Sequence, residues 1–167
     1  MTFCSVSRGV RAAMVLAFVA VLGACAPVSP PGPGGTSGSI EAPVSGGTGE
    51  VGPAVNAYRV SRGRAALVAH PALAAAAQDQ ADYLAATGRT GHEGRGGSSV
   101  MQRVRGAGMQ ACLVAENLSF GYPGAAQAVA GWKGSSGHNR NMLLREATLY
   151  GEGQAGRVRV LVLARPC

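Results

Sequence analysis

The chain has 167 residues, which is room for one domain. It carries 15 basic residues, 8 carboxylates and 3 histidines, a formal net charge of +7. Aromatic residues are not interleaved with the basic ones as they are in proteins that bind single-stranded nucleic acid, so no nucleic-acid partner is expected. A basic domain of this kind suits anionic lipid, envelope polymer or acidic protein instead.

Residues 1–24 have the layout of a signal peptide. Arg8 and Arg11 supply the positive start, and residues 12–21 form an uncharged apolar run. A membrane-spanning helix needs about 20 residues, so this run fits the apolar region of a signal peptide better. We therefore predict export, which also argues against nucleic acid. Removal of the two arginines leaves a charge of 7 − 2 = +5.

A cysteine stands at the predicted cleavage point. Leu22-Gly23-Ala24-Cys25 resembles a lipobox, where bacterial lipoproteins are cut and the new N-terminal cysteine is acylated. The resemblance implies that Cys25 anchors the mature protein firmly, since each acyl methylene contributes roughly 0.8 kcal/mol to membrane binding. Ala26 is not the aspartate that retains lipoproteins in the inner membrane of enteric bacteria, so we expect the outer membrane. The alternative is an ordinary signal peptide in which Cys25 is incidental.

Residues 25–53 are dense in Pro, Gly, Ser and Thr. Such a composition buries too little apolar surface to offset the entropy of the chain, so we predict a flexible linker. No Gly-Lys-Ser/Thr follows its glycines, which argues against a phosphate-binding loop. The folded domain is predicted to cover residues 54–167.

Two helices are predicted to begin the domain. The first opens near Val55 and ends near Gly63. The second starts at Pro71, because proline suits a first helical turn, and stops at Gly88. Apolar residues recur at helical spacing within the second one: Leu73, Ala76, Ala77, Ala81 and Leu84.

Shorter helices are predicted further along. Ser98-Ser99 caps one that runs through Arg105, and residues 125–133 form another. Ser136 is predicted to cap a third, over residues 137–144.

Fewer segments are predicted to be strands than helices. Residues 157–164 form the clearest strand, rich in β-branched residues, and residues 113–114 a weaker one. Tyr150-Gly151 leads into a segment broken by glycines. Several helices with a small sheet predict the α+β class.

Two cysteines are left for the domain. Cys4 lies in the signal peptide and Cys25 in the lipobox, which leaves Cys112 and Cys167. Exported compartments are oxidising, so we predict a disulfide between them; the alternative is two unpaired thiols. Closing a loop of about 56 residues stabilises a fold by roughly 4 kcal/mol on the chain-entropy model.

Three ionisable residues fall on segments that resemble turns: His92, Glu116 and His138. Their separations, 116 − 92 = 24 and 138 − 116 = 22, are too long for one helix or hairpin to hold them together. Only the tertiary fold can do so, and polar groups gathered on turns commonly line a cleft. We take these three as candidate cleft residues, with Asn117 and Ser135 as support.

The same residues carry a family resemblance. His92, Glu116-Asn117 and the run Trp132-x-x-Ser135-Ser136-Gly137-His138-x-x-Asn141-Met142-Leu143 are similar to the bacterial branch of the CAP superfamily. That superfamily holds the cysteine-rich secretory, antigen 5 and pathogenesis-related proteins and is also called SCP-like. Further positions follow in family order along most of the domain: Asn56, Tyr58, Arg59, Gly63, Leu67, Pro71, Leu73, Ala76, Ala77, Arg103, Gly108, Gly121 and Val129.

The resemblance implies an α-β-α sandwich, with a small antiparallel sheet flanked by helices, around a central cleft. In many relatives two histidines and two glutamates line that cleft and bind a divalent metal, often zinc. Ser135 stands at the position of one glutamate, so a zinc site here would be open to water or too weak to fill. Glu93 and Glu152 are the candidate substitutes for the missing carboxylate. The residues that match by position are His92, Glu116 and His138.

Three functions of different classes follow. We favour a monomeric, non-enzymatic module that binds a small apolar molecule, an envelope component or a partner protein, with a structural or metal-loaded cleft. The first alternative is a metal-assisted hydrolase with Glu116 as base. Ser135 or Ser136 beside His138 is a weaker nucleophile candidate, because no Gly-x-Ser-x-Gly motif is present. The second alternative is a structural envelope protein in which the cleft residues form a satisfied polar network.

Overall fold

The computed structural model describes residues 51–167, so the predicted signal peptide, Cys25 and most of the predicted linker lie outside the described residues. Within the described part, no helix has the length and apolar character needed to cross a membrane. The elements, in chain order, are α1 (Val51–Ser61), β1 (Val68–Ala69), α2 (Pro71–Thr87), the 3-10 helix η1 (Arg95–Gly97), α3 (Val100–Gly106), β2 (Ala111–Phe120), α4 (Ala125–Gly134), α5 (Ser136–Met142), β3 (Leu149–Ala155) and β4 (Val158–Pro166).

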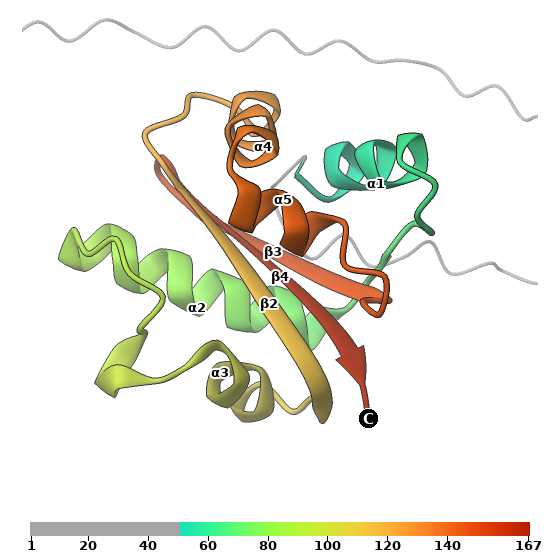
Figure 1. The fold of residues 1–167 in the computed structure, drawn as a ribbon. Coiled ribbons are helices and arrows are strands. Elements are labelled where there is room, and N and C mark those ends of the chain that lie inside the picture. The colour runs from blue at the N-terminus through green and yellow to red at the C-terminus, as the bar shows by residue number, and fades with distance from the viewer. Residues whose placement is uncertain (1–50) are drawn as a thin grey trace, which may run out of the picture. The chain divides into compact units, whose positions relative to one another are not determined.

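The sheet lies between two layers of helices. Its strand order is β1-β3-β4-β2, and β4 pairs antiparallel with both of its neighbours. Helices α2 and α3 cover one face, and α1, α4 and α5 cover the other (Figure 1). This is the predicted α-β-α sandwich of the α+β class. The sheet is antiparallel as expected except at β1, whose two residues pair parallel with β3.

Strand β4 is buried on both faces and separates two cores. Val160, Val162 and Ala164 pack with α2 and α3, whereas Leu161 and Leu163 pack with α1, α4 and α5. Successive side chains of a strand point to opposite faces, so a strand covered on both sides is a continuous apolar run. That run made β4 the clearest strand in the sequence.

Strand β3 carries glycines where it faces α2. A Cβ on Gly151 would overlap the backbone at Leu73, and a Cβ on Gly153 would overlap the backbone at Ala77. The glycines therefore let the helix lie directly on the strand. The sequence interpretation of a glycine-broken segment missed this strand, because the feature that explains its glycines is a contact with a distant helix.

The ends of two helices confirm their predicted signals. Gly88 closes α2 with a left-handed φ of 68°, which glycine adopts without strain. Ser99 caps α3 in a capping box with Gln102.

Two other helix starts differ from the prediction. Helix α1 begins at Val51 rather than near Val55, so the last residues of the predicted linker belong to this helix. The prediction that Ser136 caps α5 was wrong: the helix begins at Ser136, and Ser135 occupies the N-cap position without a side-chain cap hydrogen bond.

Strand β2 is ten residues long, although only residues 113–114 were predicted as a strand. Glu116-Asn117 therefore lies inside a strand and not on a turn, and His138 lies in α5 and not on a turn. Of the three predicted turn residues, only His92 sits on a bend. Buried polar side chains within β2, Glu116, Asn117 and Ser119, break its apolar pattern and hid the strand.

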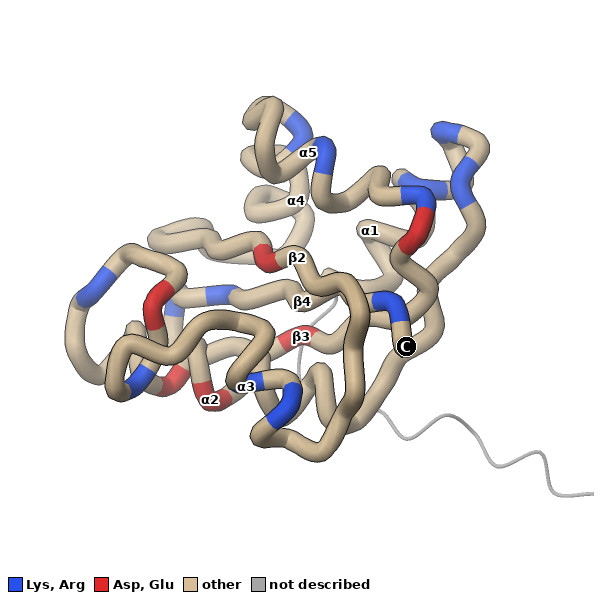
Figure 2. Tube along the Cα trace, turned by 60° about the horizontal axis from the view of Figure 1, so that its bottom comes forward, with Lys and Arg blue, Asp and Glu red and all other residues tan. Residues whose placement is uncertain are grey.

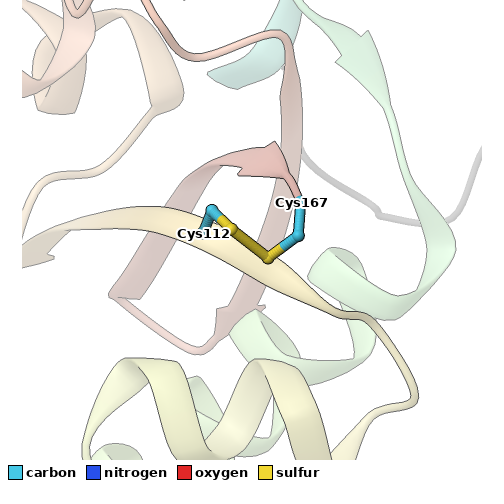
Figure 3. The surroundings of a disulfide bond; sticks show 2 residues. All are labelled: Cys112 and Cys167. Carbon is cyan, nitrogen blue, oxygen red and sulfur yellow. A yellow bond between two sulfur atoms is a disulfide. The ribbon is translucent and has the colours of Figure 1, made fainter.

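The predicted disulfide between Cys112 and Cys167 is present, with Cα atoms 4.8 Å apart (Figure 3). Cys112 sits where the register of β2 against β4 shifts, between Ala111 and Leu113, which marks a β-bulge. The disulfide fastens the end of β4 to the start of β2.

The start of α1 is held by a buried carboxylate on β3. The backbone N–H of Gly52 donates to Glu152 Oε2 at 2.9 Å, in the position where a helix dipole favours negative charge. Burial raises the pKa of Glu152, and the backbone N–H groups of Gly52 and Val51 act in the opposite direction without cancelling it.

We expect Glu152 to make the protein less stable as the pH rises. Because the folded-state pKa is raised above 4.5, the folded protein holds a proton that the unfolded chain releases in the window above 4.5. The free energy of unfolding therefore falls with pH through that window. Glu152→Gln keeps an oxygen for Gly52 and cannot ionise, so its curve should lack this decline. Urea unfolding of both proteins from about pH 4 to 8 measures the difference, and parallel curves would refute it.

Candidate functional site

The site centres on Glu116, in the middle of β2. Its side chain is 2% exposed, and each carboxylate oxygen has its own partner. Nδ1 of His92 lies 2.8 Å from Oε1, and Nη2 of Arg103 donates to Oε2 at 2.6 Å. An ionised carboxylate can only accept, so Nδ1 of His92 donates the first of these hydrogen bonds.

Arg103 is the residue of this centre to which the sequence assigned no role. It comes from α3, and its side chain is 4% exposed. Its Nη1 donates to the backbone oxygens of Ser98 and His92, at 2.7 and 3.2 Å. One guanidinium therefore holds Glu116 and also the loop that carries His92. Arg103 stood among the family-ordered positions, but no spacing in the sequence pairs α3 with β2.

Gly94 lies against this network and needs to be a glycine. A Cβ there would approach Gln80 Oε1 and Ser98 Oγ to 2.7 Å and Arg103 Nη1 to 2.8 Å. These are buried or half-buried side chains, so a larger residue would displace the arginine from its partners.

Asn117 points to the opposite face of the sheet from Glu116, as successive residues of a strand do. Its Nδ2 donates to the backbone oxygen of His138 at 3.0 Å, and its Oδ1 accepts from Asn141 Nδ2 at 3.0 Å. Asn117 thus fastens α5, whereas Glu116 fastens α3 and the His92 loop. Two adjacent residues join both helical layers to one strand.

Strand β2 lies at an edge of the sheet, and helices cover two of its backbone oxygens. Asn141 Nδ2 donates to the backbone oxygen of Glu116 at 3.2 Å, and Trp132 Nε1 donates to that of Leu118 at 2.8 Å. Buried carbonyls need donors, and an open edge invites pairing with other chains. Trp132 is 2% exposed and packs in the core, and it also closes this edge.

The two histidines come from opposite layers. His92 is 60% exposed, and His138 is half-buried in α5 with its ring centroid 6.5 Å from that of Trp132. Burial lowers the pKa of His138, and charge on His92 lowers the pKa further. Both effects favour the neutral imidazole of His138.

The other predicted residues lie around or away from this centre. Ser135 is half-buried between α4 and α5. Glu93 is exposed and lines a surface hollow with Gly88–Gly91. Glu152 binds the start of α1, on the other side of the sheet from α3, so it does not replace the missing carboxylate.

The residues present do not fit a zinc site with two histidines and two carboxylates. Arg103 and His92 engage both oxygens of Glu116, and Ser135 brings no carboxylate. Within residues 51–167, no three His, Cys, Asp or Glu side chains are grouped so as to hold a metal ion. A cation bound to Glu116 would have to displace His92 from Oε1 or the buried guanidinium of Arg103 from Oε2.

One family model matches the chain. It is the model of CAP, the cysteine-rich secretory protein family, and it covers residues 53–155. No curated protein sequence gives a significant match.

Solved bacterial structures share the fold. An extracellular protein with an SCP domain from Bacillus anthracis has a TM-score of 0.65 at 20% identity, covering 66% of this chain and 37% of that one. An outer surface protein of Borrelia burgdorferi has a TM-score of 0.64 at 17% identity, covering 70% and 90%. A cysteine-rich secretory protein of Staphylococcus aureus has a TM-score of 0.57 at 14% identity, covering 69% and 36%. The chain thus spans little more than a third of the Bacillus and Staphylococcus proteins.

Proposed function

The chain belongs to the cysteine-rich secretory protein family, CAP, and on that premise we propose that it is an extracytoplasmic binding module without enzymatic activity. Its partner is a component of the cell envelope, and acylated Cys25 tethers the module to the membrane. Three observations support this compartment: the signal-like N-terminus, a disulfide of the kind that persists outside the cytoplasm, and a fold shared with an extracellular and an outer surface protein.

The observation that supports this proposal most directly is that both carboxylate oxygens of Glu116 already have partners. A metal-assisted hydrolase needs a carboxylate that can bind the ion or take a proton from water. Here Arg103 and His92 engage both oxygens, and the arginine is itself bound to two backbone oxygens. Removal of Arg103 from this position would leave a buried charge without its partner, which is strongly unfavourable. The network therefore supports a structural role, and binding takes place on the surface of the domain.

Zinc titration tests this function. The protein for it is a chain from residue 40 onward, which keeps every described element, both cores and the disulfide. We expect micromolar zinc to produce no saturable heat and no rise in the melting temperature. His92→Ala and His138→Ala should behave in the same way, and both should remain folded by circular dichroism.

Saturable zinc binding that disappears in both histidine variants would contradict the proposal. It would mean that His92 and His138 bind a metal together, and the hydrolase would become the better hypothesis.

A further inference from the structure

We propose that the outer surface of the α1–α4–α5 layer is a docking face for an anionic phospholipid bilayer. This rests on the proposed function, because it names the partner surface of the same envelope module.

The charges are unevenly distributed between the two layers. Residues 51–167 hold 15 − 2 = 13 basic residues and 8 − 2 = 6 carboxylates. The α2–α3 side is balanced at its surface, with exposed Asp79, Asp82 and Glu93 against exposed Arg89, Arg95 and Arg105.

Among the described residues, the α1–α4–α5 side has one exposed carboxylate, Glu146, among its cations (Figure 2), and its other carboxylate, Glu152, is buried against the start of α1. Within the described residues, none of these cations is ion-paired. A surface so dominated by one sign attracts a surface of the opposite sign. We call the cations of the α1–α4–α5 side the basic face; they are Arg62, Arg64, Lys133, Arg140 and Arg145.

One aromatic ring gathers two cations of the basic face. Lys133 Nζ lies 4.5 Å and Arg62 Cζ 5.2 Å from the ring centroid of Tyr58. The hydroxyl of Tyr58 donates to Asn139 Oδ1 at 2.9 Å, which fixes the ring between α1 and α5. Contact with the face of a ring leaves N–H groups of both cations free to donate to phosphate oxygens.

A buried arginine fixes the backbone next to two cations of the basic face. Arg59 is 1% exposed, and its Nη1 donates to the backbone oxygens of Met142 and Leu144 at 2.7 and 2.9 Å. It therefore ties the end of α1 to the segment after α5. Arg64 lies just after α1, and Arg145 lies in the segment after α5. Cations held in place lose less entropy when they bind a charged surface.

A bilayer fits this face better than a small ligand does. The cations lie in α4, in α5 and in the segments that follow α1 and α5. Val60, in the last turn of α1, is 62% exposed and offers an apolar contact. Anionic leaflets attract clustered lysine and arginine in this way.

The predicted lipid anchor at Cys25 also favours a bilayer as the partner. Helix α1 begins at Val51, 51 − 25 = 26 residues after the predicted lipidated Cys25. Even fully extended, that segment keeps α1 within roughly 90 Å of the anchored residue. An anchored face meets the bilayer at high effective concentration, so weak attraction is enough.

Vesicle co-sedimentation tests the docking face, with the unlipidated chain from residue 40 onward. We expect it to bind vesicles that contain phosphatidylglycerol, not vesicles of phosphatidylcholine alone, and to dissociate as salt is raised. Arg62→Glu/Lys133→Glu should lower the partition coefficient at least about tenfold. Arg140→Glu/Arg145→Glu, which leaves Tyr58 and its contacts in place, should lower it similarly.

The matched control is Arg89→Glu/Arg105→Glu, an equal change of charge on the other layer, which should bind almost as the unmodified protein does. An equal fall in the partition coefficient of the control, or binding of the unmodified protein to neutral vesicles, would overturn the proposal. Binding to soluble polyphosphate but not to vesicles would also overturn it and assign the face to an envelope polymer. If the protein binds neither vesicles nor zinc, only the docking face is refuted. If it binds zinc through the two histidines, the proposed function is refuted.

Discussion

Glu116→Ala is expected to lower the free energy of unfolding by about 3–5 kcal/mol, the range for breaking a buried ion pair from one side. The substitution leaves the 4%-exposed guanidinium of Arg103 without its carboxylate and releases the His92 loop. The cost comes mainly from the charge left behind in a buried site without its partner. Urea unfolding followed by circular dichroism measures it.

His92→Ala is the control on the same carboxylate. Because that imidazole is 60% exposed, we expect a loss below about 1 kcal/mol. Replacing both members of the buried pair, as Arg103→Met/Glu116→Leu, should recover most of the stability, since apolar groups of similar volume often replace a buried pair at little cost. If Glu116→Ala were as stable as the unmodified protein, the carboxylate would not be structural, and a role in binding or catalysis would have to be reconsidered.

The second large effect is expected from Cys112→Ala/Cys167→Ala, which should lower the free energy of unfolding by about 4 kcal/mol. The two cysteines are 55 residues apart, so the disulfide removes much of the freedom of the unfolded chain. Both residues are exposed, so the substitution itself removes little apolar burial. The loss should therefore reflect the open loop.

Reduction of the unmodified protein is the matched control for the disulfide. Urea unfolding with reductant should move its midpoint to that of the double variant, and the reductant should leave the variant unchanged. A variant as stable as the oxidised protein would show that β2 and β4 already hold the chain end, through pairing that extends from Ala111 to Phe120.

Glu116-Asn117 explains how this small domain holds its two layers together. The strand that carries the pair lies at the edge of the sheet, where it has a neighbouring strand on one side only. Asn141 from α5 and Trp132 from α4 donate to backbone oxygens at the open edge of β2. Arg103 from α3 binds the Glu116 side chain on one face of the strand. Substitution on either face should therefore loosen one helical layer and leave the other in place.

The candidate cleft depends on a contact between residues that are distant in the sequence. His92, Glu116 and His138 were named from their scarcity and from a resemblance, and the structure places the first two in one hydrogen bond. The role of Glu116 depends on Arg103, which lies 13 residues before it on another element. No local pattern encodes that pairing.

Several features followed from the sequence alone: the family, the α+β class, the capped ends of α2 and α3, the central strand β4 and the disulfide. These depend on chemistry that is visible within a few residues, such as a glycine able to adopt positive φ, a serine three residues before a glutamine, or an apolar run. Cysteine pairing followed from the count of cysteines and the expected compartment.

Only the tertiary structure decided the rest. It placed Glu116 and Asn117 within a strand and pointed their side chains to opposite faces. It also packed α2 directly against Gly151 and Gly153. It also engaged both oxygens of the glutamate, which turned a candidate metal ligand into a buried ion pair. The physical reason is the same in each case: the partner that gives the residue its role is brought near only when the layers pack, and its distance along the chain carries no signal.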